Sequence, residues 1–169
     1  SKDRATQYPQ VNPRDTLGYA LMKERIRVLL LARSGDPRLY YKALGDNEAD
    51  LSLAQNYGNG LAHLYGAEPA SAVPRFRRLR QQYPEVMAFH TALGQAEMAA
   101  GDTQAAIETL ERARELAPRN VPVTVRYGEA LLQVLLQRAR VGGRVRFLVG
   151  GGHDRSRGTG EASPAALVR

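Results

Sequence analysis

Residues 87–120 read MAFHTALGQAEMAAGDTQAAIETLERARELAPRN, and this stretch predicts two consecutive helices. In its first half, apolar residues recur every three to four positions, which is the spacing of one helix face. Gly101 ends that helix, and Asp102 is well suited to cap the next one. The second helix carries its alanines and leucines on one side and most of its charges on the other, and Pro118 ends it. The stretch therefore predicts a pair of antiparallel helices.

The same kinds of residue return at intervals of 34 positions along the chain. Four classes of position share this interval: Gly60, Gly94 and Gly128; Ala72 and Ala106; Phe76 and Leu110; Pro84 and Pro118. Chance seldom gives four classes of residue one common period. Periods of this length are typical of helical repeat arrays, in which each helix pair buries its apolar side against its neighbours. We therefore expect an all-α fold.

This pattern resembles the tetratricopeptide repeat. The matching residues are Leu93-Gly94, Gly101, Ala106, Leu110, Ala113 and Pro118. The stretch departs from the family in two places, because His90 stands where an aromatic residue is usual and Glu97 where a tyrosine is usual. The resemblance implies a right-handed superhelix of antiparallel helix pairs that acts as a protein-interaction module.

The preceding copy, Leu53–Val86, matches the repeat more loosely and leaves one question open. Pro74 falls inside its expected second helix, where a proline removes a backbone hydrogen bond. Either Ser71 caps this helix and Pro74 lies in its first turn, or a kinked helix begins near Pro69.

The third copy begins at Val121, and only its first helix is expected. Arg140 stands where the repeat has alanine, and Gly152 stands where it has proline. Gly142-Gly143 and the glycines at 150–152 argue against a helix in this stretch, because glycine is a poor helix former.

Upstream of the repeats, the sequence predicts a helix pair outside the strict repeat register, as a divergent repeat or a cap of the array. Asn12-Pro13 is a helix start, and Gly35 closes that helix. A short second helix, Arg38–Leu44, is expected to end at Gly45. The apolar face of the first helix is expected to consist of Tyr19, Met22, Ile26, Leu29 and Leu30.

The predicted domains are an extended N-terminal segment at 1–12, a tetratricopeptide-like helical repeat domain at 13–137, and a Gly/Arg-rich tail at 138–169. The tail is expected to be flexible or to lie outside the repeat fold, and its Val145, Phe147 and Val149 alternate like a short strand. The tail holds seven arginines and two acidic residues, whereas residues 1–137 hold 17 basic and 15 acidic residues. The net charge of +7 therefore describes mainly the tail.

The sequence excludes several kinds of function. The chain has no cysteine, which excludes disulfide scaffolds, thiolate zinc sites and cysteine nucleophiles. No apolar run is long enough for a membrane span. The three histidines, His63, His90 and His153, are isolated and form no HExxH motif, so each is interpreted as a residue of the fold. We expect no enzyme activity, cofactor or metal in this part of the protein.

Nucleic-acid binding is a second hypothesis. Arg75, Arg77, Arg78 and Arg80 form a basic stripe on one helix, and the Arg-rich tail adds more charge. Clustered charge alone is enough for phosphate contacts, so the signal is unspecific. Few aromatic residues accompany the arginines, which gives base stacking little support. A solvated helix face is the favoured interpretation of the stripe, and no specific nucleic acid is expected as a partner.

Protein or peptide binding is the favoured hypothesis. An array of helix pairs exposes a concave groove lined by its first helices, and in the tetratricopeptide family this groove holds extended segments or partner helices. The repeat register assigns the following residues to the groove: Tyr57, Leu61, Leu64, Tyr65, Thr91, Gln95, Met98, Arg119, Asn120, Val125, Glu129 and Leu132. The alternative is that the leucines among them belong to the core or are covered by the N-terminal helices.

The N-terminal stretch carries a more specific resemblance. Tyr8-Pro9-x-Val11-x-Pro13, followed by Gly18-Tyr19-Ala20-Leu21-Met22-Lys23-Glu24-Arg25-Ile26-Arg27-Val28-Leu29, is similar to a segment of one peptidase family. It resembles the segment that follows the catalytic domain in bacterial periplasmic zinc metallopeptidases of the beta-barrel-assembly-enhancing type. The resemblance covers about residues 8–137.

This resemblance implies a parent protein with an HExxH zinc domain before a tetratricopeptide domain. The repeat domain would then be periplasmic and would dock on the outer-membrane-protein assembly machinery or present its clients to the protease. Zinc would belong to the catalytic domain only. A start at Ser1 without Met also predicts that the chain is part of a longer protein. The open alternative is a tetratricopeptide adaptor unrelated to any protease.

Overall fold

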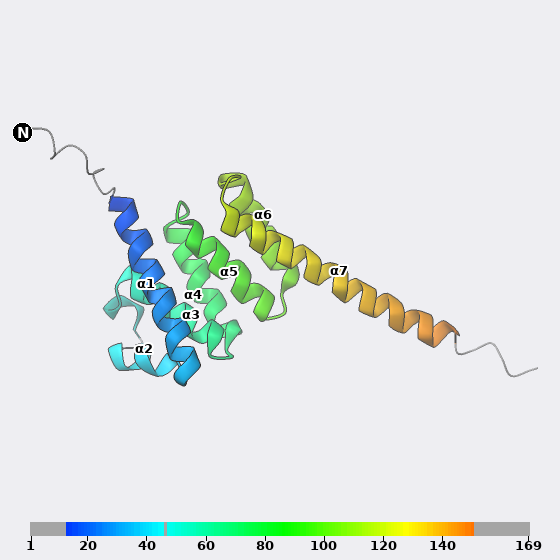
Figure 1. Cartoon of the computed structure of the whole chain (residues 1–169), viewed down its shortest axis with the longest axis horizontal. Coiled ribbons are helices and arrows are strands. Elements are labelled where there is room, and N and C mark those ends of the chain that lie inside the picture. The colour runs from blue at the N-terminus through cyan, green and yellow to red at the C-terminus, as the bar shows by residue number, and fades with distance from the viewer. Residues whose placement is uncertain (1–12, 46, 151–169) are drawn as a thin grey trace, which may run out of the picture. The chain divides into compact units, whose positions relative to one another are not determined.

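The computed structural model describes residues 13–45 and 47–150, with side chains at 16–45 and 47–141, and every regular element in this part is helical. The helices are α1 (Pro13–Ser34), α2 (Arg38–Leu44), a 3₁₀ turn (Glu48–Asp50), α3 (Leu53–Tyr65), α4 (Pro69–Gln82), α5 (Met87–Ala99), α6 (Thr103–Leu116) and α7 (Val121–Gly150). Figure 1 shows their order. The expected all-α fold is confirmed. The chain divides into two units, residues 1–134 and 135–169.

In the first unit, each helix packs mainly on its neighbours in sequence. α3 lies between α1 and α4, α4 packs on α5, and α5 packs on α6 (Figure 1). The pairs α3–α4 and α5–α6 are therefore two successive repeats of one arrangement. None of the helices in the described part of the chain is long and apolar enough to cross a bilayer.

Local signals set the ends of these helices. The Asp102 carboxylate accepts a hydrogen bond from the Ala105 amide at 3.1 Å, which confirms the predicted cap of α6. Ser52 and Gln55 form a reciprocal capping box at the start of α3. Gly45, with φ of 114°, ends α2, and Gly101, with φ of 90°, follows α5. Glycine adopts these angles without the strain that a Cβ atom would cause.

The repeating glycines are sites of close helix approach. A Cβ atom on Gly60 would lie 2.6 Å from the ring of Phe76, and one on Gly94 would lie 2.6 Å from Leu110. In both repeats the large residue of the second helix fills the space that glycine leaves on the first. Ala72 and Ala106, one turn before these large residues, are fully buried. The 34-residue period therefore reflects one helix-packing contact, glycine against a large apolar residue, that occurs in both repeats.

The question at Pro74 is resolved by the start of α4. The helix begins at Pro69, as the second alternative has it, and Ser71 does not cap it. The Ser71 amide donates a hydrogen bond to the Glu68 carbonyl, so Ser71 already lies within the first turn. Pro74 lies exposed inside the helix.

Two expectations about the tail are wrong where the structure describes it. α7 continues through Gly142-Gly143 to Gly150, and residues 145–149 are helical rather than a strand. A glycine costs about 1 kcal/mol relative to alanine in a helix, which is not enough to end a helix of good formers such as leucine, glutamine and arginine. The predicted segment 1–12 and residues 151–169 of the tail lie outside the described residues.

The expected apolar face of α1 does not form the packing face. Tyr19, Met22, Ile26, Leu29 and Leu30 are exposed, and α1 instead packs through a stripe that includes Leu21, Glu24 and Val28.

A polar contact explains why Glu24 is buried in that stripe. The Tyr41 hydroxyl donates a hydrogen bond to the Glu24 carboxylate at 2.6 Å. A Cβ on Gly58 would lie 2.7 Å from that carboxylate and 2.2 Å from the Tyr41 hydroxyl, so α3 approaches this pair closely. Burial and the neighbouring carboxylate raise the pKa of Tyr41. Because a buried charge is tolerated when it is hydrogen-bonded, the polar residue can lie inside while leucines lie outside.

Candidate functional site

An open pocket lies where α3, α5 and α7 meet in the first unit. Its volume is about 370 Å³. Its wall consists of Leu64, Tyr65, Gln95, Met98, Ala99 and Gln133. Apolar side chains with a few amides provide the mixture that commonly recognises peptide segments. We call this pocket the groove pocket.

Four of the predicted groove residues line the groove pocket. Leu64 and Tyr65 come from the last turn of α3, while Gln95 and Met98 come from the second half of α5. All four are half-buried, so each presents part of its side chain to solvent. The repeat register therefore located the pocket, because equivalent positions of successive first helices lie on the same side of the array.

Three other predicted groove residues are buried, and their assignment is wrong. Tyr57 packs its ring on Phe76 and Phe89, with centroid distances of 5.9 and 5.7 Å. Leu61 is fully buried in the same core. Thr91 is 7 % exposed and donates its hydroxyl to the carbonyl of Ala88 in its own helix. The alternative that groove leucines belong to the core therefore holds for Leu61.

The predicted residues near α7 have three different environments. Val125, Glu129 and Leu132 are exposed on α7 itself and do not line the groove pocket. Asn120 caps this helix, since its side-chain oxygen accepts a hydrogen bond from the Val123 amide at 3.1 Å. The last residue, Arg119, is exposed in the turn before α7.

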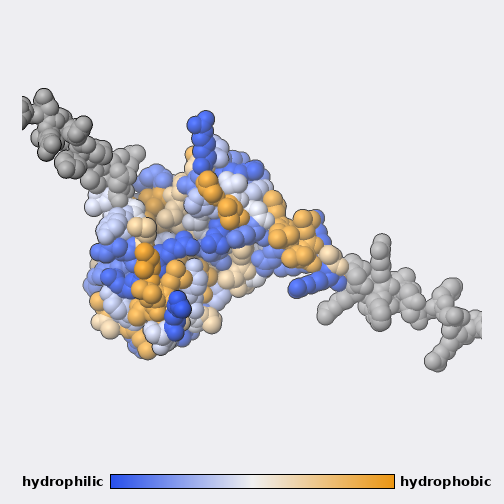
Figure 2. Space-filling view, viewed as in Figure 1, coloured by the Kyte–Doolittle hydropathy of each residue, from blue (hydrophilic) through white to orange (hydrophobic). Residues whose placement is uncertain are grey.

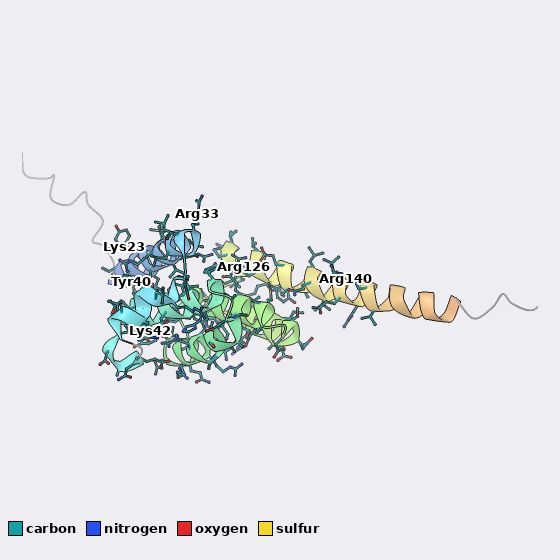
Figure 3. The ribbon with its side chains drawn as sticks, turned by 90° about the horizontal axis from the view of Figure 1, so that it is seen from below. Lys23, Arg33, Tyr40, Lys42, Arg126 and Arg140 are labelled. Atoms are coloured by element: carbon teal, nitrogen blue, oxygen red, sulfur yellow. The ribbon has the colours of Figure 1, made fainter. Side chains whose placement is uncertain are left out.

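Arg126 is a residue of this surface that the sequence argument missed. Its guanidinium donates to the Glu129 carboxylate at 2.7 Å. When the Gln95 amide is oriented to satisfy both groups, its oxygen accepts from Arg126 at 3.0 Å. Figure 3 labels Arg126 on α7. The repeat register did not indicate Arg126, because its equivalent in α5 is the buried Ala92. Its i, i+3 spacing to Glu129 was a signal that could have identified it.

Residues 57–121 match the family model described as tetratricopeptide repeat. The match spans α3 to the first residue of α7, which includes both glycine contacts described above. The match covers less than half of the chain and supports a tetratricopeptide-repeat domain in this part of it. No match was found among curated proteins or among solved structures. Tetratricopeptide repeats generally mediate protein–protein interaction, and their all-helical fold is generally non-catalytic.

The basic stripe of the tetratricopeptide-repeat domain is engaged with other groups of the protein. Arg78 and Arg75 both pair with Glu48, and Arg75 also donates to the Asn56 side chain at 3.2 Å. The other two arginines reach across to the next repeat: Arg77 lies 3.5 Å from Glu97, and Arg80 lies 3.4 Å from the Thr109 hydroxyl. Arg77 and Arg78 are still about half exposed, with 50 % and 51 % of their side chains accessible, so this part of the stripe remains a solvated helix face as expected.

Two buried titratable groups lie on α5, at the positions where the sequence departs from the repeat pattern. His90 donates from Nε2 to the Pro84 carbonyl at 2.8 Å, and burial lowers the pKa of its imidazole. Burial raises the pKa of the Glu97 carboxyl, which Thr109 and Arg77 contact. Both residues are 3 % exposed, so they hold helices together rather than face a ligand.

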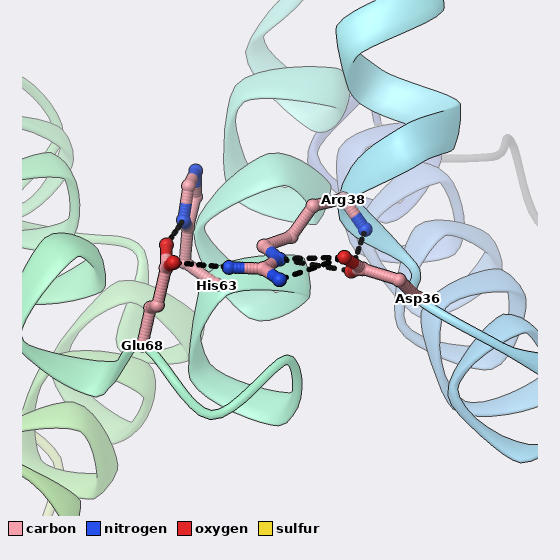
Figure 4. A network of polar contacts seen from close by, with 4 residues as sticks. All are labelled: Asp36, Arg38, His63 and Glu68. Atoms are coloured by element: carbon pink, nitrogen blue, oxygen red, sulfur yellow. Dashed lines mark hydrogen bonds and ion pairs between the residues drawn. The ribbon is translucent and has the colours of Figure 1, made fainter.

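A polar network joins the N-terminal helices to the repeats (Figure 4). Arg38, at the start of α2, pairs with Asp36 at 2.7 Å and with Glu68, and Glu68 also contacts His63 at 3.2 Å. Hydrogen bonds from Arg38 lower the pKa of Asp36 to about 2. The same guanidinium is the main cause of the lowered pKa of Glu68. This network has a structural role, since it connects the α3–α4 turn to the start of α2.

Proposed function

We propose that the domain binds a peptide segment of a partner protein in the groove pocket. The observation that carries this proposal is that three successive first helices line one open pocket. Half-buried apolar side chains come from α3 and α5, and α7 contributes the amide of Gln133. Tyr65 and Met98 supply most of its apolar chemistry, because an aromatic ring and a flexible thioether both adapt to varied side chains. The amides of Gln95 and Gln133 are placed to hydrogen-bond a peptide backbone.

Selection from a library of short displayed peptides tests the groove. Peptides selected on the wild-type domain are expected to lose at least about tenfold in affinity for the double variant Tyr65→Ala, Met98→Ala, which is roughly 1.4 kcal/mol. Circular dichroism should show unchanged helicity, because both side chains are only half-buried. Tyr19→Ala is the matched control, since Tyr19 is 60 % exposed on α1 and lies outside the pocket. Equal affinities of the double variant and wild type would overturn the proposal.

The parent protein of this domain is proposed to be a periplasmic zinc metallopeptidase. The support is the resemblance of residues 8–137 to the C-terminal part of that family. Within residues 13–45 and 47–150, no group of His, Cys, Asp and Glu could hold a metal ion, so zinc would belong to a separate catalytic domain. The groove pocket would then dock the protease on the outer-membrane-protein assembly machinery or receive its clients.

The reading frame upstream of Ser1 tests this finer proposal. We expect it to encode a signal peptide followed by an HExxH domain. An upstream frame without HExxH would overturn the protease assignment and leave a tetratricopeptide adaptor. The peptide-binding proposal is independent of this outcome, because it depends only on the groove pocket.

A further inference from the structure

The third repeating glycine lacks the partner that the first two have. A Cβ on Gly60 or Gly94 would lie 2.6 Å from the large residue that follows it by 16 positions. A Cβ on Gly128 would have no heavy atom of the described residues within 4 Å. The position 16 residues after Gly128 is Arg144, which lies in α7 itself because that helix continues to Gly150. Among the residues that the structure describes, none therefore forms a second helix packed on Gly128 as α4 and α6 are packed on Gly60 and Gly94.

The surface around Gly128 is exposed where the earlier repeat is buried. Val125 is 51 % exposed, while Thr91, 34 positions earlier, is 7 % exposed. Leu131 is 38 % exposed, while its equivalent Glu97 is 3 % exposed. On a helical projection at 100° per residue, four apolar side chains lie within about 60° on either side of Gly128. They are Val121, Val125, Leu131 and Leu132.

This Gly128 face is distinct from the groove pocket. Gln133 lies on the side of α7 that lines the groove pocket, and Val123 and Ala130 are buried. At 100° per residue, these three lie on the side of the helix away from Gly128. Figure 2 shows apolar residues gathered on the surface along α7. Exposed apolar side chains grouped around one point are typical of an interaction surface.

The contacts of Gly60 with Phe76 and of Gly94 with Leu110 indicate which side chains a helix packed on the Gly128 face would need. In α4 and α6, the residue that fills the glycine site is Phe76 or Leu110, and a fully buried alanine precedes it by four positions. The small residue allows the helix axes to approach, and the large residue fills the space above the glycine. In α5, Glu97 contacts Thr109 of α6, and the equivalent residue in α7 is Leu131. A helix that packs on the Gly128 face should therefore have an apolar residue where α6 has Thr109.

We propose that the Gly128 face binds an amphipathic helix of a partner protein that carries Ala-x-x-x-Leu or Ala-x-x-x-Phe. The partner helix continues the α3–α4 and α5–α6 packing by one further step, with its leucine or phenylalanine above Gly128. This mode is a helix docking along an apolar face. It adds a second binding surface to the domain and does not require that the groove pocket be occupied.

The chain's own α6 sequence provides the probe, because it already fills the equivalent site in the preceding repeat. A labelled peptide of residues 102–118, stapled between the exposed positions 108 and 112, is titrated with the full chain. The staple is needed because an isolated helix of this length is marginal in water. We expect saturable binding that weakens at least about tenfold when Leu110 of the peptide is replaced by alanine, which is roughly 1.4 kcal/mol.

Gly128→Leu is the decisive variant of the domain. The new side chain occupies the space above Gly128, so we expect at least tenfold weaker peptide binding and a melting temperature no lower than that of wild type. Gly18→Leu is the matched control, because Gly18 also lies in a helix with nothing within 4 Å of its Cβ position, and it should bind the peptide normally. Tyr65→Ala with Met98→Ala should also leave this binding unchanged, which separates it from the groove pocket.

Two results would overturn the proposal. One is that the stapled peptide does not bind, or binds Gly128→Leu as well as wild type. The other is that the chain forms a dimer by light scattering and Gly128→Leu makes it monomeric, since a second copy would then cover the face.

Discussion

Gly94 and Gly128 occupy the same position in successive copies of one repeat, but their surroundings are opposite. Gly94 lies under Leu110 of α6, whereas no atom of the residues described in the structure lies within 4 Å of a Cβ on Gly128. The surrounding positions follow the same division, with Thr91 buried and Val125 exposed. The comparison teaches that a repeat period marks where a helix can dock. It does not say whether the chain itself supplies that helix. The predictions below test the difference, from the largest expected effect to the smallest.

The largest effect is expected from a substitution that disrupts the packing of α6 on α5. Ala106→Arg places a charge in a fully buried helix contact, which should cost at least about 4 kcal/mol and unfold the α5–α6 repeat. Thermal unfolding followed by circular dichroism measures it. Gln104→Arg on the exposed side of the same helix is the control and should stay within about 0.5 kcal/mol of wild type. An unchanged melting temperature for Ala106→Arg would contradict the packing of α6 on α5.

Two tyrosines of α3 separate the core from the groove pocket. Tyr57→Ala removes a ring packed on Phe76 and Phe89 and should destabilise the domain by about 3–5 kcal/mol. Tyr65→Ala, at the half-buried groove pocket, should cost no more than about 1 kcal/mol. Urea unfolding measures both. Similar losses from the two substitutions would place Tyr65 in the core and remove it from the groove pocket.

The two glycines allow a direct comparison of stability. Gly94→Leu would force a side chain into Leu110 and should cost about 1–3 kcal/mol, as overpacking of a core does. Gly128→Leu meets open space and should stabilise α7 by about 0.5–1 kcal/mol, because leucine is the better helix former. Denaturant unfolding of both variants gives the difference. A destabilised Gly128→Leu would mean that another part of the protein covers this face.

The smallest effect is expected from the pH dependence of His90. Burial holds the pKa of His90 below its ordinary value of 6.5, so the unfolded chain binds a proton more readily than the folded chain. The contribution to stability is therefore complete above pH 6.5 and is lost as the pH falls through the lower folded value. His90→Gln should remove this loss.

The difference between the unfolding free energies of wild type and His90→Gln, measured from pH 7.5 downward, isolates this group. Glu97 has the opposite sign, because burial raises its pKa and its contribution is lost as pH rises, but it is present in both proteins. A difference that does not change with pH would show that His90 is not buried as a neutral ring.

The sequence predicted several helix boundaries because local signals set them. Asp102 caps α6, and Gly45 ends α2, as expected. The same reasoning failed for α1 because it counted apolar residues. The buried stripe there includes Glu24, and only the fold brings the Tyr41 hydroxyl to it.

Within the candidate site, the repeat register predicted on which side of the array a residue lies, but not whether its side chain is buried or exposed. Leu64 and Met98 line the groove pocket as predicted, whereas Tyr57 lies in the core because Phe76 and Phe89 converge on it from two other helices. Periodicity cannot reveal such a convergence, since it is a property of three helices together. Likewise, the open space above Gly128 follows from the continuation of α7, which the nearby glycines had argued against.

The absence of cysteine from the chain allows the central claim to be tested by thiol labelling. Thr91→Cys and Val125→Cys place one thiol each at equivalent positions, 7 % exposed in α5 and 51 % exposed in α7. The reaction of each thiol with a disulfide reagent is measured on the folded chain. The account predicts that Val125→Cys reacts nearly as fast as a free thiol, and Thr91→Cys at least 100-fold more slowly. Equal rates at the two positions would contradict it, because the face of α7 around Gly128 would then be as closed as that of α5.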